Sequence, residues 1–559
     1  MGHRLAHLPA VALHGMAAIC WSIPLVTQPQ GSMAGEIGKI EIADPTRPSD
    51  GTIHPAALAA QIHGPLPVNA AEAAYQAALD RARPHVLGPA IPRGPALSAM
   101  IDLPMRESLG LRYFGFTPSG ASGAKGPNDY VQSVNRVAAL FDEGLQQIIR
   151  RPLASLGGLH PSVVTQNPQL IWDPRTSRFF YAMSASAGAT ENRVAFGFSK
   201  TANPNNLSSA WCHYTYNYAS RFLDHLSLGD NRDFIIFTGN AFQPSFVGSD
   251  INAVSKPPPG TNCPSSVSFK TGFSWNLRDS GNILVQSPVA ANQIDDRATG
   301  YVAARHGDLI SGPSNKLWFF NITRNPADGK PLFSSARQLT LPNTYALPPV
   351  AEQPPKAGQP FTRLRTLDAR LTNATMAHKL KYEDDIFYAQ HTVRHPTENR
   401  SIIRWYEIDP VLNPPVVRRT GTIGEEPVHA NRFFFNAAIA PDRAVDGASK
   451  RFGNNFVVSY NFSSPTINPG IAMASSVAGG PLTFRTVQNG VGPYLDLSCP
   501  NNGDVCNWLG ASAAPDPRPD PARRRAGRGL VWATMQYSSD PTPQPDRTDW
   551  GTRIFAVQP

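Results

Sequence analysis

The sequence predicts an all-β protein, and three observations lead to this expectation. The 559-residue chain contains 54 prolines and 44 glycines, a composition that suits many short strands joined by turns. A similar unit recurs at intervals of roughly 50 to 80 residues: small apolar residues, an acidic or proline-containing turn, then an aromatic-rich strand. Residues 171–184, which begin with Ile-Trp-Asp-Pro and end with Phe-Phe-Tyr-Ala-Met-Ser, are one copy. Such repetition predicts a single β-propeller of about seven four-stranded blades, with six as the alternative count.

Two segments precede the predicted propeller. Residues 1–34 have the features of a signal peptide, because a basic start is followed by a mostly apolar stretch and by a small-x-small cleavage site at 32–34. An unstructured leader is the alternative. Residues 35–110 are rich in alanine and proline and predict an N-terminal arm or linker with a short helix at 70–83. We therefore expect a secreted or periplasmic protein, and no later segment is apolar for long enough to form a transmembrane helix.

From residue 111 to residue 559 the pattern is that of the propeller itself. Residues 129–135 and 137–141 predict two paired strands with a turn near Arg136. The first complete blade is expected from strands at 170–172, 179–184, 193–198 and 211–218. Similar series begin near Leu226, Tyr301, His378, Phe435 and Trp508.

The last predicted strand, residues 551–557, runs almost to the end of the chain. Because a ring of blades must close, we expect this strand to share a sheet with the first strands near Tyr130. A two-layer β-sandwich also has many short strands and is the runner-up fold. The repetition of one unit along the chain favours the propeller.

The cysteines predict disulfide bonds. Cys20 lies in the predicted leader, and four cysteines follow it. An even number in an exported chain is typical of disulfides, so we expect the pairs Cys499–Cys506 and Cys212–Cys263. Zinc is the alternative, but no C-x-x-C motif or close histidine accompanies these thiols, so no metal site is predicted.

The charge pattern argues against a nucleic-acid partner. The net charge is +9 and the densest basic run, residues 523–525, lies in a proline-, alanine- and arginine-rich insert that we interpret as a solvated loop. Nucleic-acid binding would need basic residues gathered on one face with stacking aromatics. We expect a monomer without a cofactor. Calcium at Asp230 and Asp233 is a lesser alternative, because the full EF-hand spacing is absent.

Six short motifs between residues 126 and 557 carry a resemblance to a known family. They are GPNDYVQSVN at 126–135, IWDP at 171–174, FSKT at 198–201, LDHLSLG at 223–229, IRWYE at 403–407 and WGTRI at 550–554. With them the chain resembles exported bacterial β-propeller proteins of unassigned activity in the sialidase-like propeller superfamily. The resemblance implies the fold and export but no settled substrate. The family tends to carry an acidic residue beside an aromatic near the C-terminal unit, whereas residues 506–510 read CNWLG.

The first group of candidate site residues lies around the motif at 223–229. It consists of Asp224, His225, Asp230 and Asp233. The start of an innermost propeller strand opens toward the central channel, where a histidine beside carboxylates can act as an acid or a base on a sugar or an ester. The structural alternative is that Asp224 and His225 hold the strand start by hydrogen bonds, while the other two aspartates belong to a polar turn.

The second group lies further along the chain. It consists of His378, Tyr382, Glu383, Arg404 and Tyr406. His378 stands in its unit about where His225 stands in its own, so we expect both side chains to line one channel. Histidine, tyrosine and arginine are the residue types with which propeller polysaccharide lyases neutralise a uronate and remove a proton. A purely structural role predicts the same repetition, so this alternative stays open.

Six tryptophans have two interpretations. They are Trp172, Trp211, Trp318, Trp405, Trp508 and Trp532, all in or beside predicted strands. If exposed, they would be platforms for sugar stacking. If buried, they would fill the space between blades.

We therefore predict a binding or interaction module outside the cell, for a glycan or a surface protein. The alternative is a carbohydrate-active enzyme, a glycosidase or polysaccharide lyase, with its site in the central channel. A propeller fold supports both, so the site has to decide between them.

Overall fold

The computed structural model describes the chain in segments. The predicted signal peptide and the predicted helix at 70–83 lie outside them, so both stay predictions. The described residues are 38–50, 105–112, 116–188, 190–309, 311–355, 362–379, 384–426, 429, 431–443, 454–496, 498–501, 504–518, 528–540 and 550–559.

The described part is nearly all β. Helix is confined in these segments to α3 (Leu153–Leu156), α4 (Ser498–Asn501) and one 3-10 turn, η1 (Ser266–Ser268). The all-β prediction is confirmed. No helix among the described residues is long and apolar enough to cross a membrane.

Several sheets consist of strands that follow one another along the chain and pair antiparallel. One contains β3 (Ser122–Lys125), β4 (Tyr130–Val134), β5 (Val137–Phe141) and β6 (Gln147–Pro152). The next contains β7 (Val164–Asp173), β8 (Arg178–Ser186), β9 (Asn192–Ser199) and β10 (Trp211–Ala219), with β1 (Ile40–Ile42) added beside β10. The predicted strand pair at 129–141 and the predicted blade at 170–218 are both confirmed.

Two further sheets have the same consecutive order. One contains β11 (Phe222–Asp230), β12 (Phe234–Phe242), β13 (Phe246–Ser255) and β14 (Thr271–Ser274). The other contains β26 (Phe433–Pro441), β27 (Phe456–Ser464), β28 (Ile467–Ser476) and β29 (Leu482–Gln488).

A larger sheet joins two such series. The first series is β15 (Gln286–Gln293), β16 (Gly300–Arg305), β17 (Ser314–Arg324), β18 (Pro331–Phe333) and β19 (Arg337–Tyr345), of which β18 and β19 both pair with β17. The second is β22 (Leu371–Lys379), β23 (Asp384–Arg394), β24 (Ser401–Asp409) and β25 (Val416–Ile423). The first strands of the two series, β15 and β22, pair in parallel.

The last sheet combines the final strands of the chain with the early strand β2. It contains β31 (Ala511–Pro515), β32 (Val531–Ser538), β33 (Trp550–Val557) and β2 (Met105–Arg112). The expectation that the final strand pairs near Tyr130 is wrong, because β33 pairs with β2, where Met105 lies opposite Val557. Tyr130 still touches this sheet, through a 2.6 Å hydrogen bond between its hydroxyl group and that of Thr534. The strands β20 (Ala351–Glu352), β21 (Arg363–Leu364) and β30 (Val505–Cys506) form a small sheet that does not pair with the others.

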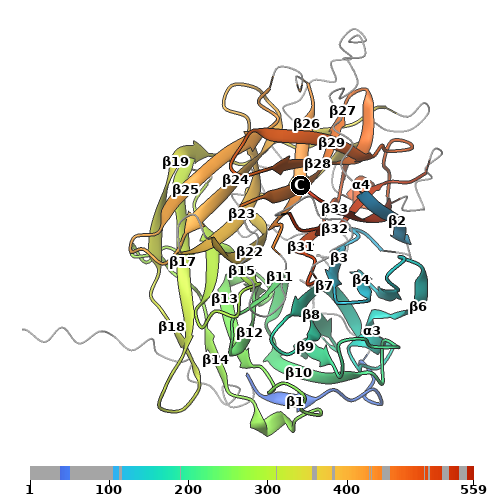
Figure 1. Cartoon of the computed structure of the whole chain (residues 1–559), viewed down its shortest axis with the longest axis vertical. Coiled ribbons are helices and arrows are strands. Elements are labelled where there is room, and N and C mark those ends of the chain that lie inside the picture. The colour runs from blue at the N-terminus through green and yellow to red at the C-terminus, as the bar shows by residue number, and fades with distance from the viewer. Residues whose placement is uncertain are drawn as a thin grey trace, which may run out of the picture.

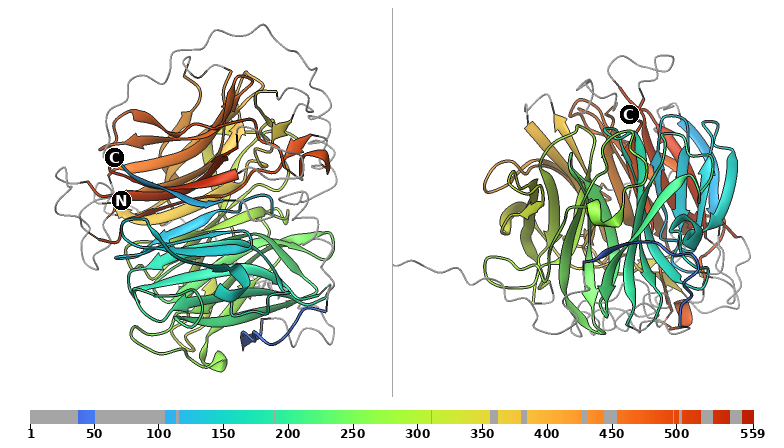
Figure 2. Two further views of the ribbon diagram at one scale, coloured as in Figure 1. Left: turned by 90° about the vertical axis from the view of Figure 1, so that its right-hand side faces the viewer. Right: turned by 90° about the horizontal axis from the view of Figure 1, so that it is seen from below.

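The first strand of each four-stranded series lies toward the middle of the molecule (Figure 1). These first strands touch one another in a cycle: β3, β7, β11, β15, β22, β26, β31 and again β3. The side views of Figure 2 show the sheets stacked beside one another with their strands running in similar directions. Each first strand therefore runs from one end of the central region to the other.

Large side chains fill the space between neighbouring sheets. Strand β12 is buried along its whole length, because both of its faces pack against other sheets. All six tryptophans that the sequence singled out are buried, with relative exposures of 7% or less. The sheet-filling interpretation of these residues is confirmed, and they offer no exposed sugar platform.

Candidate functional site

The candidate residues divide between two ends of the central region. Near their starts, four first strands carry residues with positive φ, which are Asn167, His225, Ser287 and Asn436. The ladder register shifts at each of these places, as expected for a β-bulge. We call this side the bulge end. The opposite side, where the first strands run into hairpin turns, is the turn end.

His225 belongs to the bulge end. Burial, followed by the positive charge of Arg370, lowers the pKa of His225 to about 3, and its ring hydrogen-bonds the backbone of Leu371. Arg370 is itself engaged with Asp368, at 2.7 Å, and Arg305 reaches the same carboxylate at 3.1 Å. The ring therefore sits neutral in a buried ion-pair cluster, a setting that holds structure and offers no accessible base.

Asp224, the neighbour of His225, is only 2% exposed. Its carboxylate accepts a hydrogen bond from the side-chain amide of Asn167, the bulge residue of the preceding first strand, at 3.2 Å. The contact joins two adjacent sheets. The contacts of Asp224 and His225 therefore agree with the structural alternative, in which both residues hold the start of the strand by hydrogen bonds.

His378 belongs to the turn end. Its Nδ1 atom accepts a hydrogen bond from Arg297 at 2.6 Å and lies 3.3 Å from Asp385. Its backbone N–H donates to Asp295 at 2.5 Å, and Asp295 also accepts from Arg443 at 2.7 Å. These contacts tie together the turns that follow three neighbouring first strands.

The predicted equivalence of His225 and His378 is wrong. His225 contacts Leu371 at the start of β22, whereas His378 comes seven residues later on the same strand. Seven residues of strand span about 23 Å, so the two rings lie at opposite ends of the central region. The sequence comparison failed because it matched the two histidines only by the alternating stretches that follow them. His225 lies at the bulge near the start of its strand, whereas His378 lies beside the turn near the end of its strand.

Arg404 and Tyr406 lie on one face of β24, as their alternation predicts. The hydroxyl group of Tyr406 contacts Nε2 of His391 at 2.9 Å, and Arg404 donates to the carbonyl of Thr344 at 2.7 Å. Both Tyr406 and His391 are fully buried. Tyr382 and Glu383 lie outside the described residues. In the described part of the chain, these candidate groups on β11, β22 and β24 are therefore neither gathered in one place nor open to a substrate.

The remaining two candidates, Asp230 and Asp233, lead to a pocket at the turn end. Its volume is about 270 Å³. It is lined by Arg175, Thr176, Arg232, Asp233, Phe234, Ser255, Lys256, Pro257, Pro258, Pro259, Lys270, Arg324 and Gly329. Among the lining side chains five are cationic and one is a carboxylate, which gives the pocket a basic character.

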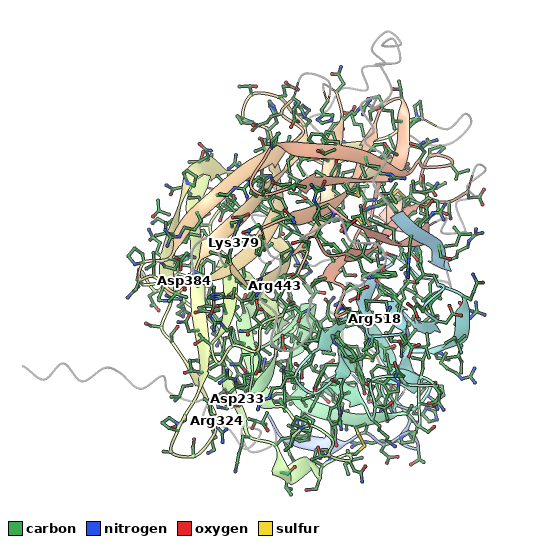
Figure 3. All side chains as sticks on the ribbon, in the orientation of Figure 1. Asp233, Arg324, Lys379, Asp384, Arg443 and Arg518 are labelled. Carbon is green, nitrogen blue, oxygen red and sulfur yellow. A yellow bond between two sulfur atoms is a disulfide. The ribbon has the colours of Figure 1, made fainter. Side chains whose placement is uncertain are left out.

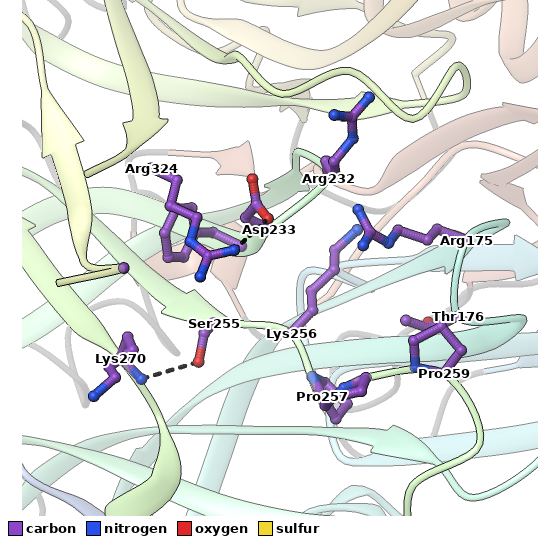
Figure 4. A pocket seen from close by; sticks show the side chains of 13 residues that line it. Arg175, Thr176, Arg232, Asp233, Ser255, Lys256, Pro257, Pro259, Lys270 and Arg324 are labelled. Carbon is purple, nitrogen blue, oxygen red and sulfur yellow. Dashed lines mark hydrogen bonds and ion pairs between the residues drawn. The ribbon is translucent and has the colours of Figure 1, made fainter. Parts of the chain in front are cut away.

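Five separate places along the chain supply the cations of this basic pocket. Arg175 comes from the β7–β8 turn, Arg232 from the β11–β12 turn, Lys256 from the segment after β13 that also holds the three prolines, Lys270 from just before β14, and Arg324 from the end of β17. Figure 4 shows Arg175 and Lys256 reaching into the same space, with Arg324 and Asp233 on its other side. In Figure 3 Asp233 and Arg324 lie in the lower part of the molecule, away from Lys379 and Arg443.

The exposed cations of the pocket are loosely paired. Arg175 and Arg232 lie 3.5 and 3.6 Å from the carboxylate of Asp296, and Arg324 lies 3.7 Å from Asp233, while Arg232 also donates to the backbone carbonyl of Asp296 at 2.9 Å. The separations from the carboxylates are longer than those of charge-assisted hydrogen bonds, so a tighter anionic partner can replace these ion pairs. Among the described residues Lys270 has no ion-pair partner, although its backbone N–H donates to the Ser255 hydroxyl group at 2.9 Å.

Lys256 is bound from behind by two carboxylates. Its ammonium group lies 2.9 Å from Asp173 and 2.6 Å from Asp230, and its side chain is 4% exposed. Burial raises the pKa of Asp230 to about 6, although Lys256 acts in the opposite direction. The same two carboxylates keep Lys256 protonated.

Both predicted disulfides, Cys212–Cys263 and Cys499–Cys506, are present. Asp496 lies with Cys499 and Cys506 in a group whose ligand atoms are within 4.8 Å of one another. Because the two sulfur atoms are bonded to each other, they do not offer thiolates to a metal ion.

Sequence reasoning missed the cations of the pocket. A weak signal exists, since Arg175 and Arg232 each follow the acidic residue of a recurring turn by two positions, after Asp173 and Asp230. Lys270 and Arg324 have no such mark. Their approach depends on the packing of sheets that are distant in sequence.

Comparison with known proteins identifies no family. No family model matches the chain, and no curated protein matches it. Solved structures that resemble it include Saccharomyces cerevisiae Sqt1, with a TM-score of 0.36, 9% identity, and coverage of 81% of this chain and 99% of that one. Trypanosoma rangeli sialidase has a TM-score of 0.32, 7% identity, and coverage of 80% and 59%.

An exo-beta-1,3-galactanase from Phanerochaete chrysosporium has a TM-score of 0.27, 11% identity, and coverage of 78% and 94%. At these TM-scores and identities the likenesses carry no argument about this chain. The resemblance to exported bacterial propeller proteins therefore stays a prediction.

Proposed function

We propose that this protein is a seven-bladed propeller that works outside the cell as a binding module for an anionic glycan, held in the basic pocket. The observation that carries the proposal is the meeting of five cationic side chains from separate parts of the chain around one open space. The structure of the pocket favours binding over catalysis, because no paired acid and base lie among its lining residues.

The blade count rests on the strand connections. Seven first strands touch in a cycle, and each begins an antiparallel series. Pairing between β2, which precedes the first series, and β33, the last strand, joins an early and a final part of the chain, which is how a propeller avoids an open edge. The two disulfides support an oxidising location outside the cell.

The chemistry of the pocket fits the acidic groups of a glycan. Guanidinium groups bind carboxylates and sulfates through two parallel N–H donors, and Arg175, Arg232 and Arg324 supply three of them. The exposed residues Pro258 and Pro259, which follow buried Pro257, form a rigid apolar wall on which the carbon face of a sugar can lie. An acidic sugar offers both kinds of surface.

The proposal is tested on a glycan array that carries sulfated and uronate-containing glycans beside their neutral counterparts. We expect the protein to retain acidic glycans and to release neutral ones. Calorimetry with a heparin-derived tetrasaccharide then gives the affinity, which is expected to fall when salt is raised, because screening weakens exposed ion pairs. A parallel assay for released reducing sugar is expected to stay at background.

Three arginine and lysine variants locate the site. Arg232→Gln and Lys270→Gln are each expected to weaken tetrasaccharide binding by about three- to tenfold, the effect of losing one partly exposed charge-assisted contact. Arg278→Gln is the matched control, because Arg278 is exposed and does not line the pocket. Equal affinities for all three variants, or equal retention of neutral glycans on the array, would refute the proposal, and so would release of reducing sugar.

A further inference from the structure

We infer that the pocket binds its anion together with a proton, which is taken up by the carboxyl group of Asp230. The inference rests on the proposed function, since it describes how binding at that pocket is regulated. Its physical basis is a buried group of three charges directly behind the pocket wall, formed by Lys256, Asp173 and Asp230.

With both carboxyl groups ionised, these three groups have a net charge of −1, because one ammonium group faces two carboxylates. Lys256 Nζ lies 2.9 Å from Asp173 and 2.6 Å from Asp230, so two carboxylates share one ammonium group. Asp173 and Asp230 are 2% and 1% exposed, which leaves the excess charge without water around it. Such a group gains a proton more readily than a single ion pair does.

Hydrogen bonds decide which carboxyl group takes the proton. Asp173 accepts from the backbone N–H groups of Arg175 and Thr176, at 3.3 and 3.2 Å, and from the Thr176 hydroxyl group, in addition to Lys256. Among the described residues, Asp230 accepts only the Gln293 N–H, at 2.7 Å, besides Lys256. Since donors favour the charged carboxylate, Asp230, which has fewer donors than Asp173, is the proton acceptor. Burial, which raises the pKa of Asp230 to about 6, agrees with this assignment.

Lys256 couples this proton to the ligand, because the same residue lines the pocket. A proton on Asp230 removes one negative charge close beneath the anion, so the pocket becomes more positive by one unit. Conversely, a bound anion repels the charge on Asp230 and raises its proton affinity. Ligand and proton therefore favour each other's binding, and the coupling is reciprocal.

The other charged groups around Asp230 do not reverse this effect, which is tighter anion binding at lower pH. Arg178 packs beside Asp173 on β8, Arg175 and Arg232 lie above on their turns, and Asp233 and Asp296 pair with the exposed arginines. The lining residues include no histidine. Arginine and lysine keep their charge between pH 5 and 8, so they do not produce a pH dependence in that range.

The test is calorimetry with the heparin-derived tetrasaccharide at pH 5.0 and pH 7.5, using the full chain. Its sulfate groups stay charged at both values. We expect binding to be about three- to tenfold tighter at pH 5.0, the range expected from one charge at this separation under partial screening. Near pH 6.5, titrations in two buffers of different ionisation enthalpy are expected to show net proton uptake on binding.

Two matched variants locate the proton. Asp230→Asn is expected to bind equally at both pH values, with the affinity that the wild type has at pH 5.0. Asp233→Asn removes a charge of the same sign from the pocket wall, so it is expected to bind more tightly at both pH values while the difference between them remains. If Asp230→Asn does not fold, absence of proton uptake by the wild type still overturns the inference.

The outcomes separate this inference from the proposed function. Absence of tetrasaccharide binding at both pH values would overturn the proposed function and the inference with it. Binding of equal strength at both pH values, without proton uptake, would overturn the inference alone. A pH dependence that survives in Asp230→Asn would also overturn it, because another group would then be the acceptor.

Discussion

His391 lies fully buried between a backbone carbonyl and a tyrosine. Its Nδ1 atom lies 3.0 Å from the carbonyl of Ala369, which only accepts, so this nitrogen carries the hydrogen. Its Nε2 atom is then the acceptor for the hydroxyl group of Tyr406, at 2.9 Å. Burial, followed by the charge of Arg404, lowers the pKa of His391 to about 3. The neutral ring is thus a structural hydrogen-bonding group of the core.

This depressed pKa predicts a loss of stability in acid. Below the unfolded value near 6.5 the unfolded chain binds a proton that native His391 refuses, so the free energy of unfolding falls as pH decreases. The loss amounts to about 2 kcal/mol at pH 5. His391→Gln, which cannot gain the proton, should lose about 2 kcal/mol less than the wild type between pH 7.5 and 5.0 in urea unfolding.

Comparing the two proteins is necessary because other groups titrate in the same range. His225 has a lowered pKa of about 3 and acts in the same direction, whereas the raised pKa of Asp230 acts in the opposite direction. Both contributions cancel in the difference between variant and wild type. Equal pH slopes for the two proteins would contradict the assignment of a neutral His391.

Glu407 illustrates how burial determines the contribution of an ion pair to the free energy of unfolding. It is fully buried and lies 2.5 Å from Lys379 and 2.9 Å from Arg419. We expect Glu407→Gln to destabilise the protein by about 3 kcal/mol, because it leaves buried Lys379 without its nearby carboxylate. Chemical unfolding at pH 7 measures this difference.

Glu398→Gln is the matched control for that experiment. Glu398 pairs with buried Arg400 at 2.5 Å but is itself 49% exposed, and Arg400 keeps a hydrogen bond to the carbonyl of Gly424 when the charge of Glu398 is lost. The expected loss of stability is below about 1 kcal/mol. If the two variants lose equal stability, burial is not what distinguishes these ion pairs.

At the scale of elements, the bulges of the first strands are joined to the neighbouring sheets. Ser184 donates to the carbonyl of Leu223 at 2.7 Å, Thr238 to that of Pro288 at 2.6 Å, and Gln390 to that of Ala437 at 2.6 Å. In each case a side chain on a second strand satisfies a carbonyl near the bulge of the next first strand. A bulge frees backbone groups from its own ladder, and the adjacent sheet supplies the partner.

The pairing of β2 with β33 predicts that residues 105–112 are needed for folding. A chain that starts at residue 104 retains β2, whereas one that starts at residue 113 lacks it. The first is expected to fold, and the second is expected to aggregate or to lose several kcal/mol, because its β33 edge has lost its ladder and its cover. Circular dichroism and thermal melting of the two purified proteins measure the difference, and equal melting temperatures would count against it.

At the scale of the whole molecule, a closed ring of sheets predicts that the protein still folds when its chain ends are moved to another exposed turn. Met105 and Val557 lie opposite each other on neighbouring strands, so a link of about four residues can join residue 559 to residue 104. New ends placed between Gly479 and Gly480, in the exposed turn after β28, should give a permuted protein that folds with nearly the same melting temperature.

A second permuted protein serves as its control. New ends between Tyr460 and Asn461 would cut β27 in its buried middle and are expected to prevent folding. Calorimetric melting distinguishes the two proteins. Failure of the first to fold would contradict closure of the ring through β2 and β33.

Much of the local structure was predictable because strand patterns are local. Residues 129–141 form the expected strand pair, and residues 170–218 form the expected four strands with Trp172 and Trp211 buried. The disulfides were predictable from their even number and spacing. The closing partner of β33 was not, because residues 105–112 lack the aromatic-rich pattern of the recurring unit, and only their place in the ladder makes them a strand.

The sequence by itself determined that this chain is all-β and where many of its strands and turns lie, since these follow from alternation and turn chemistry over short distances. The even number of cysteines after the predicted leader also indicated disulfides. Only the tertiary structure decided that His225 and His378 lie at opposite ends of the central region and that Arg175, Arg232 and Arg324 meet around one pocket. The reason is that a bulge shifts the register of a strand, and that packing brings distant turns together. Neither effect leaves a periodic trace in the sequence.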